Sequence, residues 1–137
     1  RAERATTRQP RPQPHGSVHL GARFTRHPAY QPGLALVADP GHPATRHLPP
    51  AWEFTDEWYD FDRVPDGPAR VLLRADEGSY DGGGMGADHP LAWCRERGPA
   101  GGRMFYTSLG HASGAYRDPD FLAHLNGGLL WASGATK

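Results

Sequence analysis

The sequence is poor in cysteine and has no long apolar run. Cys94 is its only cysteine among 137 residues, which excludes an internal disulfide framework and fits a reducing compartment. No apolar stretch approaches the roughly 20 residues that a transmembrane helix needs. The first residues are polar and lack the apolar stretch of a signal peptide. We therefore expect a cytoplasmic protein that does not bind a membrane.

The formal net charge at pH 7 is zero. The 15 basic and 15 acidic side chains cancel, so nothing in the composition predicts binding to nucleic acid. The length suits a single domain. Composition leaves the oligomeric state undecided, and a homo-oligomer stays open.

Glycine, proline and aromatic residues are abundant. The 18 glycines and 14 prolines come close to the proportion typical of low-complexity chains. Residues 1–16, "RAERATTRQPRPQPHG", are predicted to form a disordered Arg/Pro-rich leader. Most aromatic side chains follow residue 50, and they argue for a folded unit over residues 17–137.

The order of elements predicts a mixed α/β fold. Strands are expected over 33–39 and 70–76, and 52–61 is expected to be partly extended. Residues 90–96 and 103–109 flank "RGPAGG" and predict a β-hairpin. A closing helix should begin at Asp118, a good N-cap followed by proline, and end near Gly134.

Two other features favour structural interpretations. The stretch "DGGGMG" (81–86) lacks the spaced glycines of a phosphate-binding loop, so we interpret it as a mobile loop. Cys94 lies in mid-strand among apolar residues, which predicts a packed thiol rather than a nucleophile.

The acidic pair Asp56–Glu57 is the first candidate for chemistry. Adjacent strand residues point to opposite faces, so one carboxylate can face a cleft while the other meets a partner or water. A carboxylate next to a histidine orients it and stabilises its charged form. The alternative is a solvated pair or a salt bridge to arginine.

Two histidines stand at the ends of the hairpin strands away from the turn. His89 enters the first strand and His111 leaves the second, so we expect them to be neighbours at one edge of the sheet. Such a pair suits acid–base chemistry, metal ligation or sugar binding, and a structural hydrogen-bonding role for each is the alternative. Their spacing matches no standard zinc motif; we predict no dedicated metal site and no cofactor.

Arg103 opens the second hairpin strand. Its guanidinium suits an anion or a sugar oxygen. It equally suits a cross-strand pair with a carboxylate such as Glu96, which we favour.

Several motifs together resemble the ThuA-like family, named for trehalose utilisation, over residues from about 20 to 134. They are "LGARFTRHPAYQ", "DPGHPAT", "DEWYDF", "HPLAW", "GGRMFYTSLGH" and "FLAHLNGGLLWASG". The resemblance implies part of a flavodoxin-like, three-layer α/β domain similar to class I glutamine amidotransferases, with central parallel strands. Only the C-terminal part of that domain is matched, so we expect the chain to be a fragment.

The same resemblance implies a role in using trehalose or a related disaccharide, including 3-keto sugars, with a small carbohydrate as partner. The family's motif positions fall on these residues: His27, His42, Asp56, Glu57, Tyr59, His89, Arg103, Gly110 and His111. The leading hypothesis makes His111 the general acid or base, oriented by Glu57 or Asp56.

The remaining motif residues are expected to bind the sugar: His89, Arg103, His27, His42 and Tyr59. One alternative is a non-catalytic sugar-binding or regulatory module in which Trp58, Tyr59 and Trp93 stack on a pyranose. Another is an inactive fragment.

Overall fold

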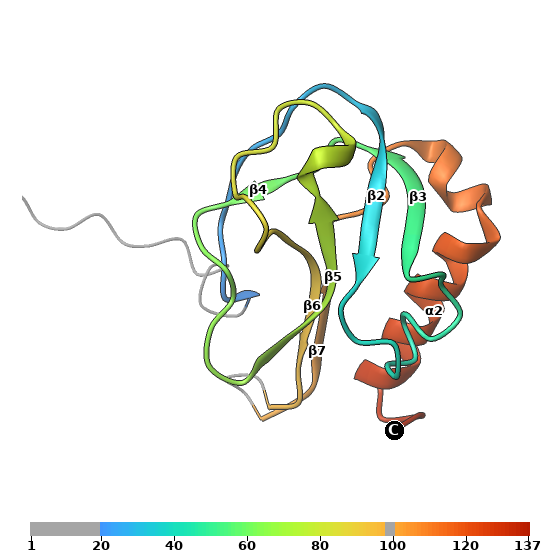
Figure 1. Ribbon diagram of the computed structural model, residues 1–137. Helices are drawn as coiled ribbons and strands as arrows, with labels where there is room; N and C mark the ends of the chain where they lie inside the picture. Colours follow the sequence, from blue (N-terminus) through green and yellow to red (C-terminus); the bar gives the residue numbers. More distant parts are fainter. Residues whose placement is uncertain (1–19, 98–100) are drawn as a thin grey trace, which may run out of the picture.

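A five-stranded sheet and one long helix are the main elements of the computed structural model, which describes residues 20–97 and 101–137 (Figure 1). The leader predicted over residues 1–16 lies outside the described residues. The sheet has the order β3-β2-β5-β6-β7, and a separate ladder pairs β1 with β4. The strands are β1 (Phe24–Arg26), β2 (Gln31–Val37), β3 (Ala51–Asp56), β4 (Asp60–Phe61), β5 (Ala69–Asp76), β6 (Pro90–Arg95) and β7 (Met104–Thr107).

The strand pairings confirm the predicted hairpin and correct one expectation. β6 and β7 pair as a hairpin, with Ala92 opposite Thr107. All strand pairs among the described residues are antiparallel, whereas the family resemblance implied central parallel strands. The physical reason lies in the connections: 38–50 and 77–89 contain no α-helix, and parallel neighbours need a crossover that is usually helical.

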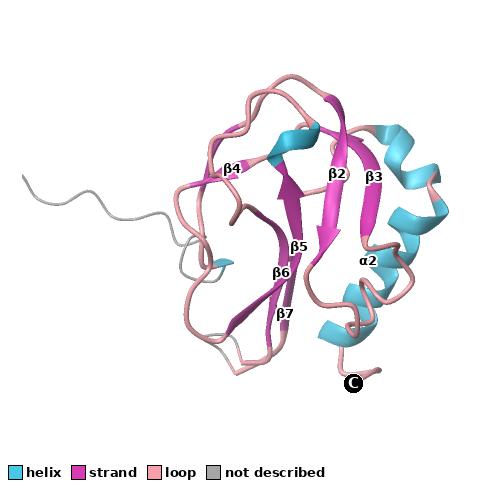
Figure 2. Ribbon diagram, in the orientation of Figure 1, coloured by secondary structure: helices cyan, strands magenta, loops and turns pink. Residues whose placement is uncertain are grey.

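Helix α2 (Pro119–Ala132) covers one side of the sheet (Figures 1 and 2). Its start is as predicted, because the Asp118 carboxylate accepts hydrogen bonds from the N–H groups of Asp120 and Phe121. A short 3-10 turn, η2 (Ser113–Arg117), leads into it, and another, η1 (Glu77–Ser79), follows β5. Within the described residues, no helix is long and apolar enough to cross a membrane.

The main core lies between the sheet and α2. Strand β3 alternates buried and exposed residues and turns Trp52 and Phe54 inward, where the Phe54 ring lies 5.5 Å from that of Phe121 on α2. Burying such side chains stabilises a fold by about 1.5–3 kcal/mol each. Cys94 is 1% exposed, which confirms the packed thiol, and burial raises its pKa.

Two buried histidines join α2 to the loop before β3. His124 donates from Nδ1 to the Ala44 carbonyl at 2.8 Å, and its Nε2 accepts from the Thr107 hydroxyl at 3.0 Å. His42 accepts the Ala44 N–H on Nδ1 at 3.0 Å. Burial lowers the pKa of both histidines from 6.5 to about 4. Both therefore serve the fold in the neutral form.

These two histidines predict acid-sensitive stability. In the unfolded chain these imidazoles become protonated below pH 6.5, whereas in the folded chain they do so only near pH 4. The free energy of unfolding therefore keeps its full value above pH 6.5 and falls as the pH drops toward 4. At pH 5 each histidine should lower the free energy of unfolding by roughly 2 kcal/mol. Urea unfolding at pH 7.5 and at pH 5 measures this loss. His42→Asn, which keeps an acceptor for the Ala44 N–H but cannot titrate, should reduce the loss by about half. An equal reduction in the His47→Gln control, at an exposed position, would contradict this account.

The close approach of α2 gives a second prediction. A Cβ at Gly127 would clash with the Pro43 carbonyl, whereas a Cβ at Gly114 would meet no atom within 4 Å. Ala in place of Gly inside a helix normally gains about 1 kcal/mol. Gly127→Ala should instead lower the free energy of unfolding by about 1–3 kcal/mol, while Gly114→Ala should leave it within about 0.5 kcal/mol. Chemical denaturation compares the two, and a more stable Gly127→Ala variant would refute the backbone contact.

Candidate functional site

The carboxylate of Asp56 ties the end of β3 to the segment that follows β7. Asp56 Oδ2 accepts the Gly110 N–H at 2.7 Å and Oδ1 accepts the Glu57 N–H at 2.8 Å. Gly110 has φ +99°, and a Cβ there would clash with the Phe121 ring, so only glycine fits. Burial raises the pKa of Asp56 against the opposing effect of these N–H groups. The contact sets Glu57 next to His111.

Trp58 makes a sharp bend directly after Glu57. Its φ of +56° is the only positive value at a non-glycine position in the described part of the chain. Such a backbone costs of order 1–3 kcal/mol. Two contacts hold it: Trp58 Nε1 donates to the Gln31 carbonyl at 2.9 Å, and the ring stacks 4.8 Å from Tyr80. The bend separates β3 from β4 and turns Glu57 and Tyr59 toward His111.

Four side chains meet at this bend, and we call them the outer cluster: His27, Glu57, Tyr59 and His111. Glu57 Oε1 lies 2.8 Å from His111 Nε2, and Oε2 lies 3.3 Å from His27 Nε2. The Tyr59 hydroxyl lies 3.2 Å from His111 Nδ1. A carboxylate only accepts hydrogen bonds, so His111 donates from Nε2 and accepts from Tyr59 on Nδ1. Three groups thus form a chain: carboxylate, imidazole, phenol.

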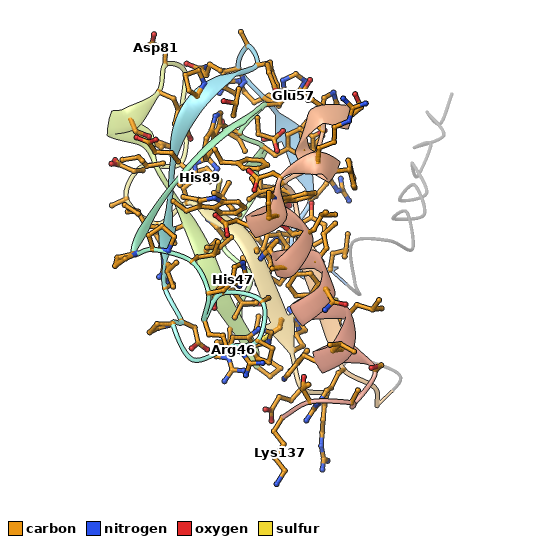
Figure 3. All side chains as sticks on the ribbon, turned by 90° about the vertical axis from the view of Figure 1, so that its right-hand side faces the viewer. Arg46, His47, Glu57, Asp81, His89 and Lys137 are labelled. Atoms are coloured by element: carbon orange, nitrogen blue, oxygen red, sulfur yellow. The ribbon has the colours of Figure 1, made fainter. Side chains whose placement is uncertain are left out.

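The two histidines of the outer cluster are exposed to solvent, whereas its carboxylate is mostly buried. The side chains of His111 and His27 are 48% and 38% exposed, whereas that of Glu57 is 13% exposed. In Figure 3 Glu57 lies toward the end of the molecule opposite Lys137. Burial, followed by the nearby Glu57 carboxylate, raises the pKa of Tyr59, so the phenol stays protonated. The arrangement can therefore exchange protons with a bound molecule.

His89 lies behind the outer cluster rather than in it. It is 0% exposed, and its Nε2 lies 2.8 Å from the Tyr59 carbonyl. The sequence predicted that His89 and His111 would be neighbours; the structure links them through the two ends of Tyr59. The buried position of His89 leaves it no exposed face for direct contact with a sugar.

The structure brings neither His42 nor Arg103 to the outer cluster. His42 lies under α2, 5.0 Å from the Trp131 ring. Arg103 donates from Nη1 to the carbonyls of Trp131 and Thr136, both at 2.9 Å, instead of forming the favoured pair with Glu96. A guanidinium at the C-terminal end of a helix is favourable because the last carbonyls lack partners there.

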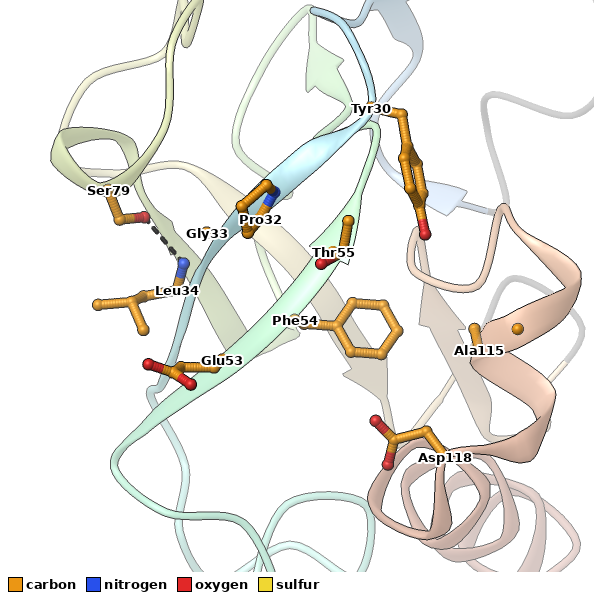
Figure 4. A pocket seen from close by; sticks show the side chains of 11 residues that line it. Tyr30, Pro32, Gly33, Leu34, Glu53, Phe54, Thr55, Ser79, Ala115 and Asp118 are labelled. Atoms are coloured by element: carbon orange, nitrogen blue, oxygen red, sulfur yellow. Dashed lines mark hydrogen bonds between the residues drawn. The ribbon is translucent and has the colours of Figure 1, made fainter.

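One hollow in the described structure contains none of the eight predicted site residues. It has a volume of about 650 Å³ between β2, β3 and η2, and its walls include Tyr30, Thr55 and Asp118 (Figure 4). Thr55 directly precedes Asp56, so the hollow borders the end of β3 that leads to the outer cluster. A ligand held by the exposed histidines could extend in this direction.

Comparison with known proteins decides the family. The family model described as trehalose utilisation, ThuA, matches residues 5–132. The chain belongs to the ThuA family. A search of curated proteins finds no match.

Two solved structures resemble this ThuA-family chain. A putative ThuA-like protein from Bacteroides uniformis is 25% identical, with a TM-score of 0.71 over 85% of this chain and 49% of that one. A putative ThuA-like protein from Parabacteroides merdae is 26% identical, with a TM-score of 0.53 over 83% of this chain and 42% of that one. The chain therefore spans about half the length of these relatives.

The Asp56 contact predicts a specific loss of stability. Asp56→Asn removes an ionised acceptor, and its amide N–H₂ would face a backbone N–H. Hydrogen bonds to charged groups contribute about 1.5–3 kcal/mol each, so we expect a loss of about 2–3 kcal/mol in urea unfolding. Asp81→Asn, at an exposed loop position, is the matched control. Equal stability of the two variants would show that the Asp56 contact does not hold the site.

Proposed function

We propose that the outer cluster carries out proton transfer on a small carbohydrate, a disaccharide of the trehalose type or its 3-keto derivative. The observation that carries the proposal is the chain Glu57–His111–Tyr59, in which a half-exposed imidazole lies between a mostly buried carboxylate and a neutral phenol. Membership of the ThuA family supports the substrate class.

In this proposal His111 is the general acid–base. Glu57 holds Nε2–H and stabilises the imidazolium that forms when Nδ1 takes up a proton. A keto sugar suits such a group because the C–H next to a carbonyl is acidic. His111 removes that proton, directly or through the Tyr59 hydroxyl, and the electron pair moves onto the carbonyl oxygen. The imidazolium then gives this proton to the carbonyl oxygen, which yields the enediol of the keto sugar and regenerates the neutral imidazole.

Asp56 acts as a positioning residue. Its carboxylate is buried and holds the backbone of Gly110 and Glu57, so it does not face a substrate. It keeps Glu57 and His111 within hydrogen-bonding distance, which matters because a displacement of about 1 Å can cost 10²-fold in rate.

The neighbouring aromatic surface favours a sugar. The Phe24 ring is 46% exposed and lies 4.6 Å from the Tyr59 ring. An exposed apolar ring beside polar groups can pack on the C–H face of a pyranose. The aromatic set predicted from sequence was wrong in part, since Trp58 and Trp93 are 1% and 0% exposed. Both rings can be buried because each indole N–H donates a hydrogen bond to a backbone carbonyl, that of Gln31 for Trp58 and that of Leu20 for Trp93.

We further propose that the complete family domain has the flavodoxin-like, three-layer arrangement. The match to the Bacteroides uniformis structure, over 85% of this chain but 49% of that one, supports this. In such a domain, segments outside this chain would supply the rest of the wall around the sugar.

Replacing the acid–base group tests the function. His111→Ala in a full-length homologue should lower the turnover of a 3-keto disaccharide by about 10²–10⁴-fold, with a smaller change in KM. His47→Ala, which removes an imidazole that bonds to the Asp120 carbonyl, is the matched control and should keep full turnover. Unchanged turnover in His111→Ala would refute the mechanism. Saturable binding of the sugar by the unmodified homologue without any product would favour a binding module instead.

A further inference from the structure

A second polar group lies behind Tyr59, and we call it the inner triad: Asp60, Glu77 and His89. One ligand atom from each lies within 4.8 Å of the other two. Asp60 belongs to β4, Glu77 belongs to η1, and His89 directly precedes β6. Asp60 and His89 are 3% and 0% exposed, and Glu77 is partly exposed. His89 Nδ1 lies 2.9 Å from Glu77 Oε1, and Nε2 lies 3.8 Å from Asp60 Oδ1. Three segments distant in the sequence thus present nitrogen and oxygen donors to one place.

One carboxylate oxygen of Asp60 lacks a hydrogen-bond partner. Its side chain is 5% exposed, and Oδ2 pairs with Arg26 Nη1 at 2.7 Å. Oδ1 is buried and has no hydrogen-bond partner. Leaving a charged acceptor buried and unsatisfied costs free energy. This oxygen is directed at His89, so the missing partner belongs inside the triad.

We propose that the inner triad binds one divalent first-row transition-metal ion, with Asp60 Oδ1, a Glu77 oxygen and an imidazole nitrogen of His89 as ligands. Ligands 2.0–2.2 Å from an ion lie about 3–3.5 Å from one another, so donors that now lie within 4.8 Å of one another would have to move together by up to about 1.5 Å. One imidazole with two carboxylates and no thiolate suits Mn²⁺, Fe²⁺ or Zn²⁺. The two carboxylates supply negative charge to such an ion, and Arg26, which pairs with Asp60 Oδ2, offsets part of it.

The contacts of the His89 ring indicate which nitrogen can hold the ion. Its Nε2 lies 2.8 Å from the Tyr59 carbonyl, and its Nδ1 lies 2.9 Å from Glu77 Oε1 and 3.3 Å from the Tyr80 hydroxyl. A carbonyl only accepts hydrogen bonds, so Nε2 donates to it, whereas a hydroxyl can donate to Nδ1. Metal ligation needs an unprotonated nitrogen, and Nδ1 is the one left for it.

The glycine-rich loop 81–86 lies over the inner triad and orients it. Met85 N–H and Gly86 N–H donate to the two oxygens of Glu77 at 2.6 and 2.8 Å. Burial alone would raise the pKa of Glu77, but these N–H groups and His89 outweigh it and lower it. A Cβ at Gly84 would come within 2.5 Å of Asp60 Oδ2. Hydrogen bonds of this kind are typical around the ligands of a metal.

An ion in the inner triad goes beyond the proposed function, because His89 is fully buried and no sugar can reach it. Its effect on the outer cluster would be indirect. His89 contacts the carbonyl of Tyr59, whose hydroxyl contacts His111. The ion would fix β4, through Asp60, to the segment directly before β6, through His89.

Calorimetric titration of the chain with MnCl₂, after treatment with EDTA, tests the proposal. We expect one saturable site with a stoichiometry of about one ion per chain. Asp60→Asn should weaken binding at least tenfold. Asp88→Asn, an exposed carboxylate paired with Arg74, is the matched control and should bind like the unmodified chain.

Three results would overturn the proposal: no saturable binding, equal binding by Asp60→Asn and by the unmodified chain, or loss of binding in His111→Ala. The last result would show that the ion binds at the outer cluster instead. If Asp60→Asn fails to fold, NMR of the unmodified chain replaces it. Paramagnetic Mn²⁺ should then broaden the amide signals of Met85 and Gly86 before that of His111. The reverse order would place the ion elsewhere.

Discussion

The hydrogen bond between the Asp56 carboxylate and the Gly110 N–H is the contact on which the site depends. Asp56 ends β3, and Gly110 follows β7, and these strands are opposite edges of the five-stranded sheet. Gly110 lies three residues beyond the end of β7, so the segment after this strand closes the distance between the two edges. Phe121 of α2 packs against Gly110, so the helix supports the closure. The proposed acid–base pair is a consequence of this closure.

Tyr59 connects the two polar groups that the closure creates. Its hydroxyl faces the exposed outer cluster, and its carbonyl faces the buried inner triad. The bend at Trp58 is what gives one residue access to both, because an extended backbone would have continued β3. The two groups differ in burial, which suits proton exchange with a ligand on one side and ion binding on the other.

Local patterns in the sequence were enough to predict the hairpin, the strands 33–39 and 70–76, and the helix with its Asp118 cap, because each depends on short-range periodicity and turn chemistry. A carboxylate next to His111 was also predicted, from two motifs of the family, but the choice between Asp56 and Glu57 stayed open until the structure placed Glu57 there. The direction of neighbouring strands was not predicted, since it depends on connections that carry no helix. Nothing in the sequence marks the positive φ of Trp58, and no spacing rule joins Asp60, Glu77 and His89, because the sheet brings them together from three segments.

The tautomer of His111 tests the central claim most directly. Long-range ¹H–¹⁵N spectra at pH 8 report which ring nitrogen carries the proton. If Asp56 holds Glu57 against His111, the unmodified chain will show the neutral ring protonated at Nε2, and Asp56→Asn will show a mixture of the two tautomers. A ring protonated at Nδ1 in the unmodified chain, or the same spectrum in both proteins, would contradict the account.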